Sequence, residues 1–168
     1  MSQQEKQPAA DAQNHPRFEP EQIYIKDSRF HASQPAELFR SQSQVPALQI
    51  QLHLDTKTYK LTAELYEVAL KVAVTALPQN SQTAVYQAEV SQAGLFAISN
   101  YGKEDFEHIV NVSCPSMLFP YARQVLSGLI ERAGFPSMVL APMNFEILHK
   151  QYQERLQQTN QAPVQPKH

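Results

Sequence analysis

The side chains that could carry metal chemistry are spread along the chain without a ligand spacing. A zinc site on a helix needs two histidines on one face, four residues apart, so that both ring nitrogens reach the ion. No two of the six histidines have that separation: His15, His31, His53, His108, His149 and His168. The histidines therefore favour no metal site.

Cys114 is the only cysteine, so it has no partner for an internal disulfide or a thiolate zinc site. A Cys-Pro step ahead of a helical pattern carries no nucleophile signature, and we interpret Cys114 as a packing residue. The carboxylates Glu64, Glu67, Glu104 and Asp105 fall on expected strand faces and loops, where charged groups are usually solvated. We therefore predict a protein that is not an enzyme.

A phosphate-binding loop needs clustered glycines, which let backbone amides close around the anion. The chain has four glycines, and only Gly102-Lys103 resembles part of such a loop. The position five residues before Gly102 is Ala97, and the residue after the lysine is Glu104, so the motif fails at both ends. This pattern predicts no ATP or dinucleotide site and no cofactor.

Net charge and hydropathy argue against several further classes of protein. Lys+Arg 14 against Asp+Glu 16 gives a net charge of -2, which argues against a nucleic-acid-binding protein. The longest apolar runs, such as residues 138–141, are far shorter than the roughly 18 residues of a membrane span. The polar start is not typical of a signal peptide, and a lone cysteine suits a reducing compartment. We expect a soluble, cytoplasmic protein.

A chain of 168 residues has room for one domain, whose strands and helices would position these side chains. Residues 1–17 and 157–168 are rich in Gln, Ala and Pro, and we predict a disordered N-terminal arm and a disordered C-terminal tail. The domain is expected over residues 18–156. Its first half has two-residue periodicity and its second half helical periodicity, which predicts an α+β fold.

Four strands are expected in the first half, forming an antiparallel sheet. Residues 22–31 have the mixed pattern of an edge strand, and residues 48–55 alternate leucine or isoleucine with polar residues. Residues 61–77 also fit a helical stripe, but their β-branched residues favour a long strand with Val68, Leu70, Val72 and Val74 on one face. Residues 83–92 are expected to form the returning strand, and Gly94, just after it, permits a bend or bulge.

Two C-terminal helices are expected on this sheet. Residues 116–133 carry apolar side chains at three- and four-residue intervals, with Pro120 in the first turn and Gly134 as the stop. Asn144 is the expected cap of a last helix that carries Phe145, Leu148, Tyr152 and Leu156.

Two sequence blocks resemble the SecB family of bacterial protein-export chaperones. They are Leu118-Phe119-Pro120-Tyr121-Ala122-Arg123 and Leu140-Ala141-Pro142-Met143-Asn144-Phe145. Shorter matches, such as Ile23-Tyr24-Ile25-Lys26-Asp27 and Ala88-Glu89-Val90, occur in the family's order. The resemblance covers about residues 18–156.

This resemblance implies a four-stranded antiparallel sheet with two helices, assembled as a homotetramer that is a dimer of dimers. It implies an ATP-independent holdase, whose extended apolar grooves hold unfolded precursor proteins for export. The positions similar to the family's groove are Ile50, Leu52, Leu54, Tyr86, Ala88, Val90 and Phe145. Each of these could instead belong to the core, because alternation separates two faces without saying which one is covered.

The family also presents acidic residues to the SecA translocation ATPase. The matching positions here are Asp27 and Glu89. Two neighbours depart from the family's pattern, since His31 stands where an acid is typical and Gln87 replaces an apolar residue.

The alternative function is a small ligand-binding or enzymatic α+β domain with a closed pocket. Tyr24, Tyr66, Tyr86 and a histidine would line that pocket.

Overall fold

The computed structural model describes residues 15–33, 35–40, 47–79 and 82–160. The predicted arm and tail therefore lie mostly outside the described residues. Among the described residues, the first strand starts at Arg17 and the last helix runs to Asn160.

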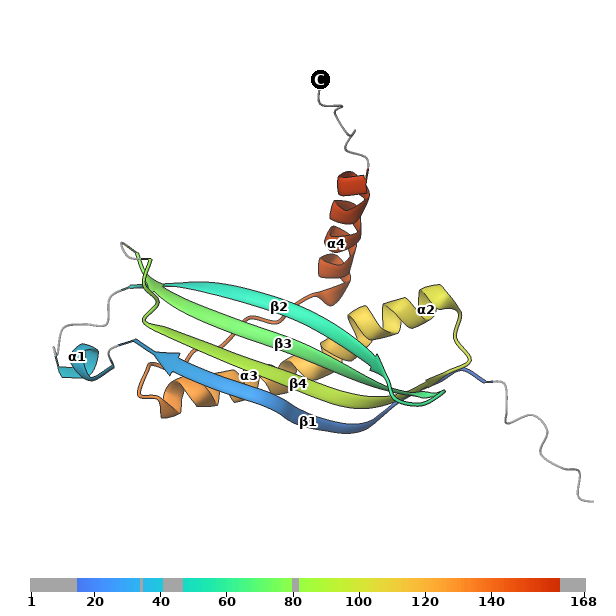
Figure 1. Ribbon diagram of the computed structural model, residues 1–168, viewed down its shortest axis with the longest axis horizontal. Coiled ribbons are helices and arrows are strands. Elements are labelled where there is room, and N and C mark those ends of the chain that lie inside the picture. Colours follow the sequence, from blue (N-terminus) through green and yellow to red (C-terminus); the bar gives the residue numbers. More distant parts are fainter. Residues whose placement is uncertain (1–14, 34, 41–46, 80–81, 161–168) are drawn as a thin grey trace, which may run out of the picture.

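Four strands form one antiparallel sheet, as the alternation predicted. They are β1 (Arg17–Ala32), β2 (Leu48–Lys60), β3 (Leu65–Pro78) and β4 (Tyr86–Ser99), in the order β1-β4-β3-β2. The long run around Val68 is strand β3 rather than a helix, and β1 and β2 form the two edges (Figure 1). A short helix, α1 (Pro35–Arg40), lies between β1 and β2.

Gly94 does not form a bulge in its strand. The register of β4 with β3 continues through it, and the register shifts lie in β1, between Pro20 and Gln22 and between Ile25 and Asp27. A Cβ at Gly94 would stand 2.7 Å from the ring of Phe96 and 3.2 Å from Leu118. A side chain at this position would displace the ring of Phe96, so the glycine leaves room for neighbouring side chains, and no bulge forms at the point where it permits one.

The helix after the sheet begins well before the expected start. It consists of α2 (Lys103–His108), a π-helical turn (Ile109–Ser113) and α3 (Cys114–Arg132) in succession. The Cys114 N–H donates to the Ile109 carbonyl, five residues earlier, so the backbone hydrogen bonds of the helix lengthen from four to five residues just before Pro115. The Cys-Pro step therefore does not start the helix, and Pro120 lies inside α3 instead of in its first turn.

The two helix boundaries predicted from Gly134 and Asn144 are confirmed. Gly134 has a φ of 87°, which suits glycine, and the Phe135 N–H donates to the Ile130 carbonyl at 3.2 Å. Asn144 Oδ1 accepts a hydrogen bond from the Ile147 N–H at 3.2 Å, at the start of α4 (Phe145–Asn160).

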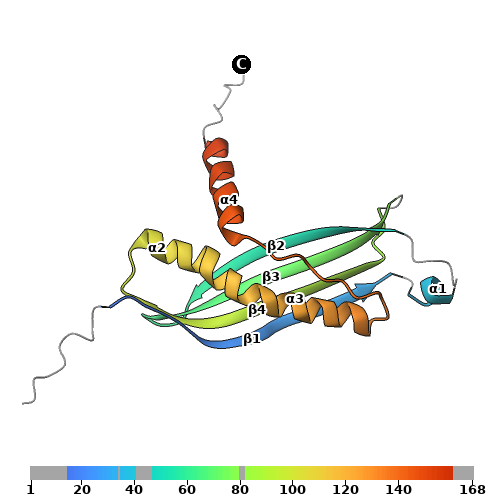
Figure 2. The ribbon, with the colours of Figure 1, turned by 180° about the vertical axis from the view of Figure 1, so that it is seen from behind.

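One helix, α3, covers the sheet. Leu118, Ala122, Leu126 and Ile130 are fully buried on it, against a sheet face that includes Val68, Leu70, Val72, Val74 and Val90. Figure 2 shows α3 lying along the sheet while α4 projects away from it. The predicted sheet with two C-terminal helices is confirmed, and of the two helices only α3 lies along the sheet, whereas α4 contacts the core at its first turn through Phe145 and Leu148. Among the described residues, no helix is long and apolar enough to cross a membrane.

Candidate functional site

The apolar face of the sheet is wider than the helix that covers it. The register places Ile50 beside Ala76 and Tyr86, Leu52 beside Val74 and Ala88, and Leu54 beside Val72 and Val90. The six strand positions matched to a client groove therefore share one face, which is the face that α3 covers.

Burial divides these six positions by strand. Tyr86, Ala88 and Val90 are 4%, 1% and 0% exposed, because β4 lies beneath α3. On edge strand β2, Ile50 and Leu52 are 40% and 38% exposed, and Leu54 is half-buried. The β4 residues are thus buried in the core, and of the six positions only those on β2 keep substantial exposed surface. We call Ile50, Leu52 and Leu54 the β2 strip.

A cleft of about 390 Å³ continues from the β2 strip toward α4. Leu54, Asn111, Leu148 and Tyr152 are among the residues that line it. Phe145, the seventh predicted position, also lines the cleft, but it is only 6% exposed and its ring packs 5.8 Å from Phe119. Along α4, large apolar side chains remain exposed at Ile147, Tyr152 and Leu156.

An aromatic cluster that the sequence analysis missed lies where α1 meets the end of α3. The ring of Phe135 lies 4.7 Å from Tyr86 and 5.3 Å from Phe39, and Phe30 lies 5.7 Å from Tyr86. Phe39 is 47% exposed and rests against Gly134, where a Cβ would come within 3.2 Å of its ring. The sequence signal for this cluster was the Gly134-Phe135 dipeptide, because the phenylalanine supplies one ring and the glycine leaves space for the ring of Phe39.

The opposite face of the sheet is polar and carries cross-strand ion pairs. Glu89 pairs with Lys71 at 2.8 Å, and Asp27 pairs with Arg29 on its own strand at 2.7 Å. The register sets Arg29 beside Glu89, so Asp27 and Glu89 lie on neighbouring strands of one charged surface. The structure thus brings these two predicted acids together on the face away from α3.

The side chains considered for catalysis or metal binding do not form a reactive centre. Cys114 is fully buried, and burial raises the pKa of its thiol to about 12, so it is a protonated packing residue at neutral pH. In the described ranges, no three His, Cys, Asp or Glu side chains are placed to hold a metal ion.

The three tyrosines of the alternative function do not converge on one pocket. Tyr66 packs 4.9 Å from Phe106, near the end of the sheet away from Tyr86. Burial and the carboxylate of Glu67 raise the pKa of Tyr24, and Glu67 itself is ion-paired with Lys26. This arrangement does not favour the closed-pocket alternative.

Comparisons with known proteins agree with this geometry. Residues 11–158 match the family described as preprotein translocase subunit SecB. The protein-export protein SecB of Pseudomonas putida is 37% identical over 98% of this chain and 99% of its own length. That of Pseudomonas aeruginosa is 38% identical over 98% of each chain.

A solved structure shows the same fold at lower identity. It is a SecB-like chaperone of Mycobacterium tuberculosis, in complex with a peptide from an antitoxin. It superposes with a TM-score of 0.62 at 18% identity, over 76% of this chain and 91% of that chain.

Proposed function

The chain belongs to the SecB family of protein-export chaperones, and from this premise we propose how it holds clients and which partners it serves. Unfolded precursor proteins bind in an extended apolar groove that consists of the β2 strip and the cleft beside α4. The observation that supports this best is the exposure of Ile50 and Leu52 directly beside a closed core. Large apolar side chains left exposed side by side are typical of a surface that binds another chain.

Holding an unfolded chain requires contacts that almost any sequence can supply. An apolar strip along an edge strand offers burial for alternate client side chains, and the open edge of β2 offers backbone hydrogen bonds. Several such grooves on one assembly bind a long client multivalently, so modest contacts add up to tight holding. Binding the unfolded state in preference to the folded one keeps a slow-folding precursor competent for export without ATP.

Delivery to the SecA translocation ATPase is proposed to use the charged face with Asp27 and Glu89. Both carboxylates are exposed in part and lie away from the β2 strip, on the other side of the sheet. A client in the groove would therefore leave this face open. We place the activity in the cytoplasm, where an export chaperone meets precursors before they cross the membrane.

Charge reversal on this face is expected to separate delivery from holding. Asp27→Lys or Glu89→Lys should weaken SecA binding about tenfold or more. A surface that binds these two acids is expected to be basic, and the new lysine would repel it. Suppression of the aggregation of a denatured protein, measured without nucleotide, should stay at the wild-type level. Glu104→Lys, in α2, makes the same charge change elsewhere and is the control. Wild-type SecA affinity in both variants would contradict the proposed contact.

The protein is proposed to act as a homotetramer, a dimer of dimers. Apolar side chains remain exposed on and beside α3, with Met117 at 37%, Tyr121 at 49% and Val139 at 76%. A surface of this kind suits self-association in a symmetric assembly. Light scattering at micromolar concentration is expected to give about 76 kDa, four times the 19.0 kDa of one chain. A monomeric mass would contradict the assembly and would remove the multivalent groove.

A further inference from the structure

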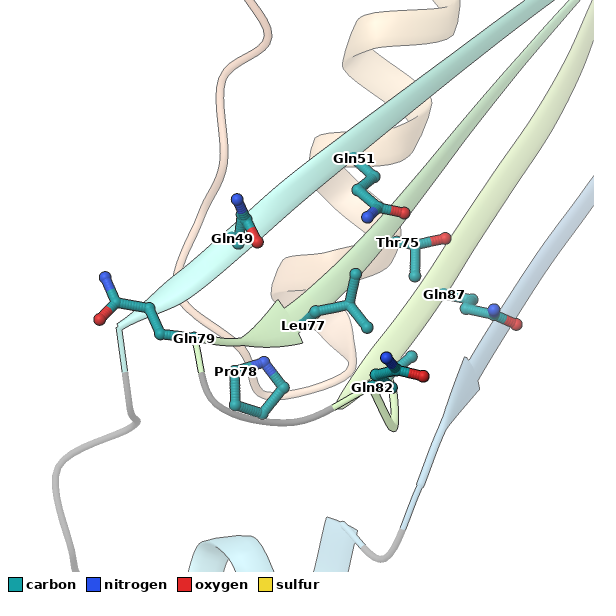
Figure 3. Close-up of a pocket in the computed structure, with 9 residues that line it drawn as sticks. Gln49, Gln51, Thr75, Leu77, Pro78, Gln79, Gln82 and Gln87 are labelled. Carbon is teal, nitrogen blue, oxygen red and sulfur yellow. The ribbon is translucent and has the colours of Figure 1, made fainter.

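One end of the polar face carries glutamines in place of ion pairs. Where β2 begins and β3 turns toward β4, a hollow of about 830 Å³ is lined by Thr75 and the carboxamides of Gln49, Gln51, Gln79, Gln82 and Gln87 (Figure 3). Leu77, Pro78 and Ala84 supply its apolar part, and none of the described residues that line it is ionisable. We call this site the amide hollow.

The change from charge to amide takes place within one row of the sheet. Gln51, Thr75 and Gln87 are cross-strand neighbours and form one row across β2, β3 and β4. The next row toward the middle of the sheet contains His53, Ala73 and Glu89, and Glu89 is paired with Lys71. The amide hollow is therefore a separate, uncharged region of a face that is otherwise charged.

The carboxamides of the hollow are available to a ligand. Gln49, Gln51 and Gln87 are exposed, and within the part of the chain that the structure describes their side chains form no hydrogen bond with another residue. Each carboxamide offers two N–H donors and one carbonyl acceptor. A site with this composition can satisfy a ligand that has both donors and acceptors, but it has no countercharge with which to offset the desolvation of an ion.

We propose that the amide hollow binds an uncharged stretch of extended polypeptide through hydrogen bonds to its backbone. An extended chain presents one N–H and one carbonyl per residue, which matches the donor and acceptor character of the glutamines. Two strand spacings separate Gln51 from Gln87, about 10 Å, which is the length of about three extended residues. The absence of charge from the lining selects against segments rich in Lys, Arg, Asp or Glu.

The test uses the full-length protein and a capped decapeptide of alternating serine and glutamine, which has neither charge nor large apolar side chains. Glutamine side-chain NH₂ resonances of the isotope-labelled protein report each position separately. Those of Gln49, Gln51 and Gln87 are expected to shift saturably as the peptide is added. Those of Gln22 in β1 and Gln124 in α3 should not move. Peptides with lysine or glutamate in place of glutamine should bind roughly tenfold more weakly.

Matched variants test whether the glutamines themselves are responsible. Gln51→Glu with Gln87→Glu keeps the shape of both side chains, removes their donors and adds charge, and should weaken binding of the decapeptide roughly tenfold or more. Gln22→Glu with Gln124→Glu makes the same change in net charge elsewhere and should leave the affinity unchanged.

Four results would overturn the proposal. They are unshifted resonances at Gln49, Gln51 and Gln87, equal binding of the charged peptides, equal loss of affinity in the control variant, and a response of these resonances to a neutral oligosaccharide but not to the peptide. Because the decapeptide lacks apolar side chains, none of these results depends on whether the β2 strip holds clients.

Discussion

Replacement of Tyr86 by alanine is expected to lower the free energy of unfolding by about 3–5 kcal/mol, the usual cost of truncating a large aromatic residue in a core. Tyr86 is 4% exposed, and its ring contacts those of Phe30 and Phe135. Burial also raises the pKa of its hydroxyl, in keeping with a side chain withdrawn from water. The truncation leaves a cavity between the end of α3 and the sheet.

Tyr86→Phe is the matched control, because it keeps the ring and removes only the hydroxyl. Denaturant unfolding of the two variants and the wild type, at one fixed protein concentration, measures the difference. The phenylalanine variant should stay within about 1.5 kcal/mol of the wild type. Wild-type stability together with weakened client binding in Tyr86→Ala would instead make Tyr86 a groove residue.

The double substitution Ile50→Ser with Leu52→Ser is expected to weaken the binding of unfolded clients roughly tenfold per groove. Full burial of such a side chain contributes about 1.5–3 kcal/mol, and about two fifths of each is exposed and available to a client. The two losses together amount to about 1–2 kcal/mol, which corresponds to roughly a tenfold change in affinity. Titration of a permanently unfolded, fluorescently labelled protein without nucleotide measures this affinity.

The control for this variant lies on the same strand. His53→Ser with Lys57→Ser changes two side chains on the other face of β2 and should leave client affinity unchanged. His53→Ser with Lys57→Ser should unfold within about 1 kcal/mol of the wild type, because both side chains are exposed. Ile50→Ser with Leu52→Ser also loses the buried three fifths of each side chain and should be about 2–4 kcal/mol less stable, so its client affinity is measured under conditions where it is fully folded. Wild-type client affinity in Ile50→Ser with Leu52→Ser would contradict the proposed groove.

Local patterns predicted most of the fold. The alternation in residues 48–55 and the β-branched run around Val72 determined the strands, because a side-chain period of two fits only an extended chain with two different faces. Gly134 and Asn144 marked helix boundaries through their own backbone and capping preferences. The blocks around Pro120 and Pro142 indicated the family, which the comparisons then showed.

Features that depend on distant neighbours could not be predicted in this way. Gly94 permitted a bend or bulge because a glycine in a strand often marks one, whereas in the structure Leu118, which comes from α3, packs over it together with the ring of Phe96. The helix was expected to start at residue 116, because proline is common in the first turn of a helix and Cys114-Pro115 fits such a start. In the structure the helical segment begins at Lys103, and a π-helical turn over Ile109–Ser113 carries it past the proline.

The sequence by itself determined that Ile50, Leu52 and Leu54 share one face of their strand and that Tyr86, Ala88 and Val90 share one face of theirs, since alternation is a property of each strand alone. Only the tertiary structure decided that α3 lies over β3 and β4 and leaves edge strand β2 partly open. Leu52 and Ala88 therefore have equivalent local patterns and different surroundings. Burial depends on which element packs above a residue, and the helix position is determined by packing across the whole sheet.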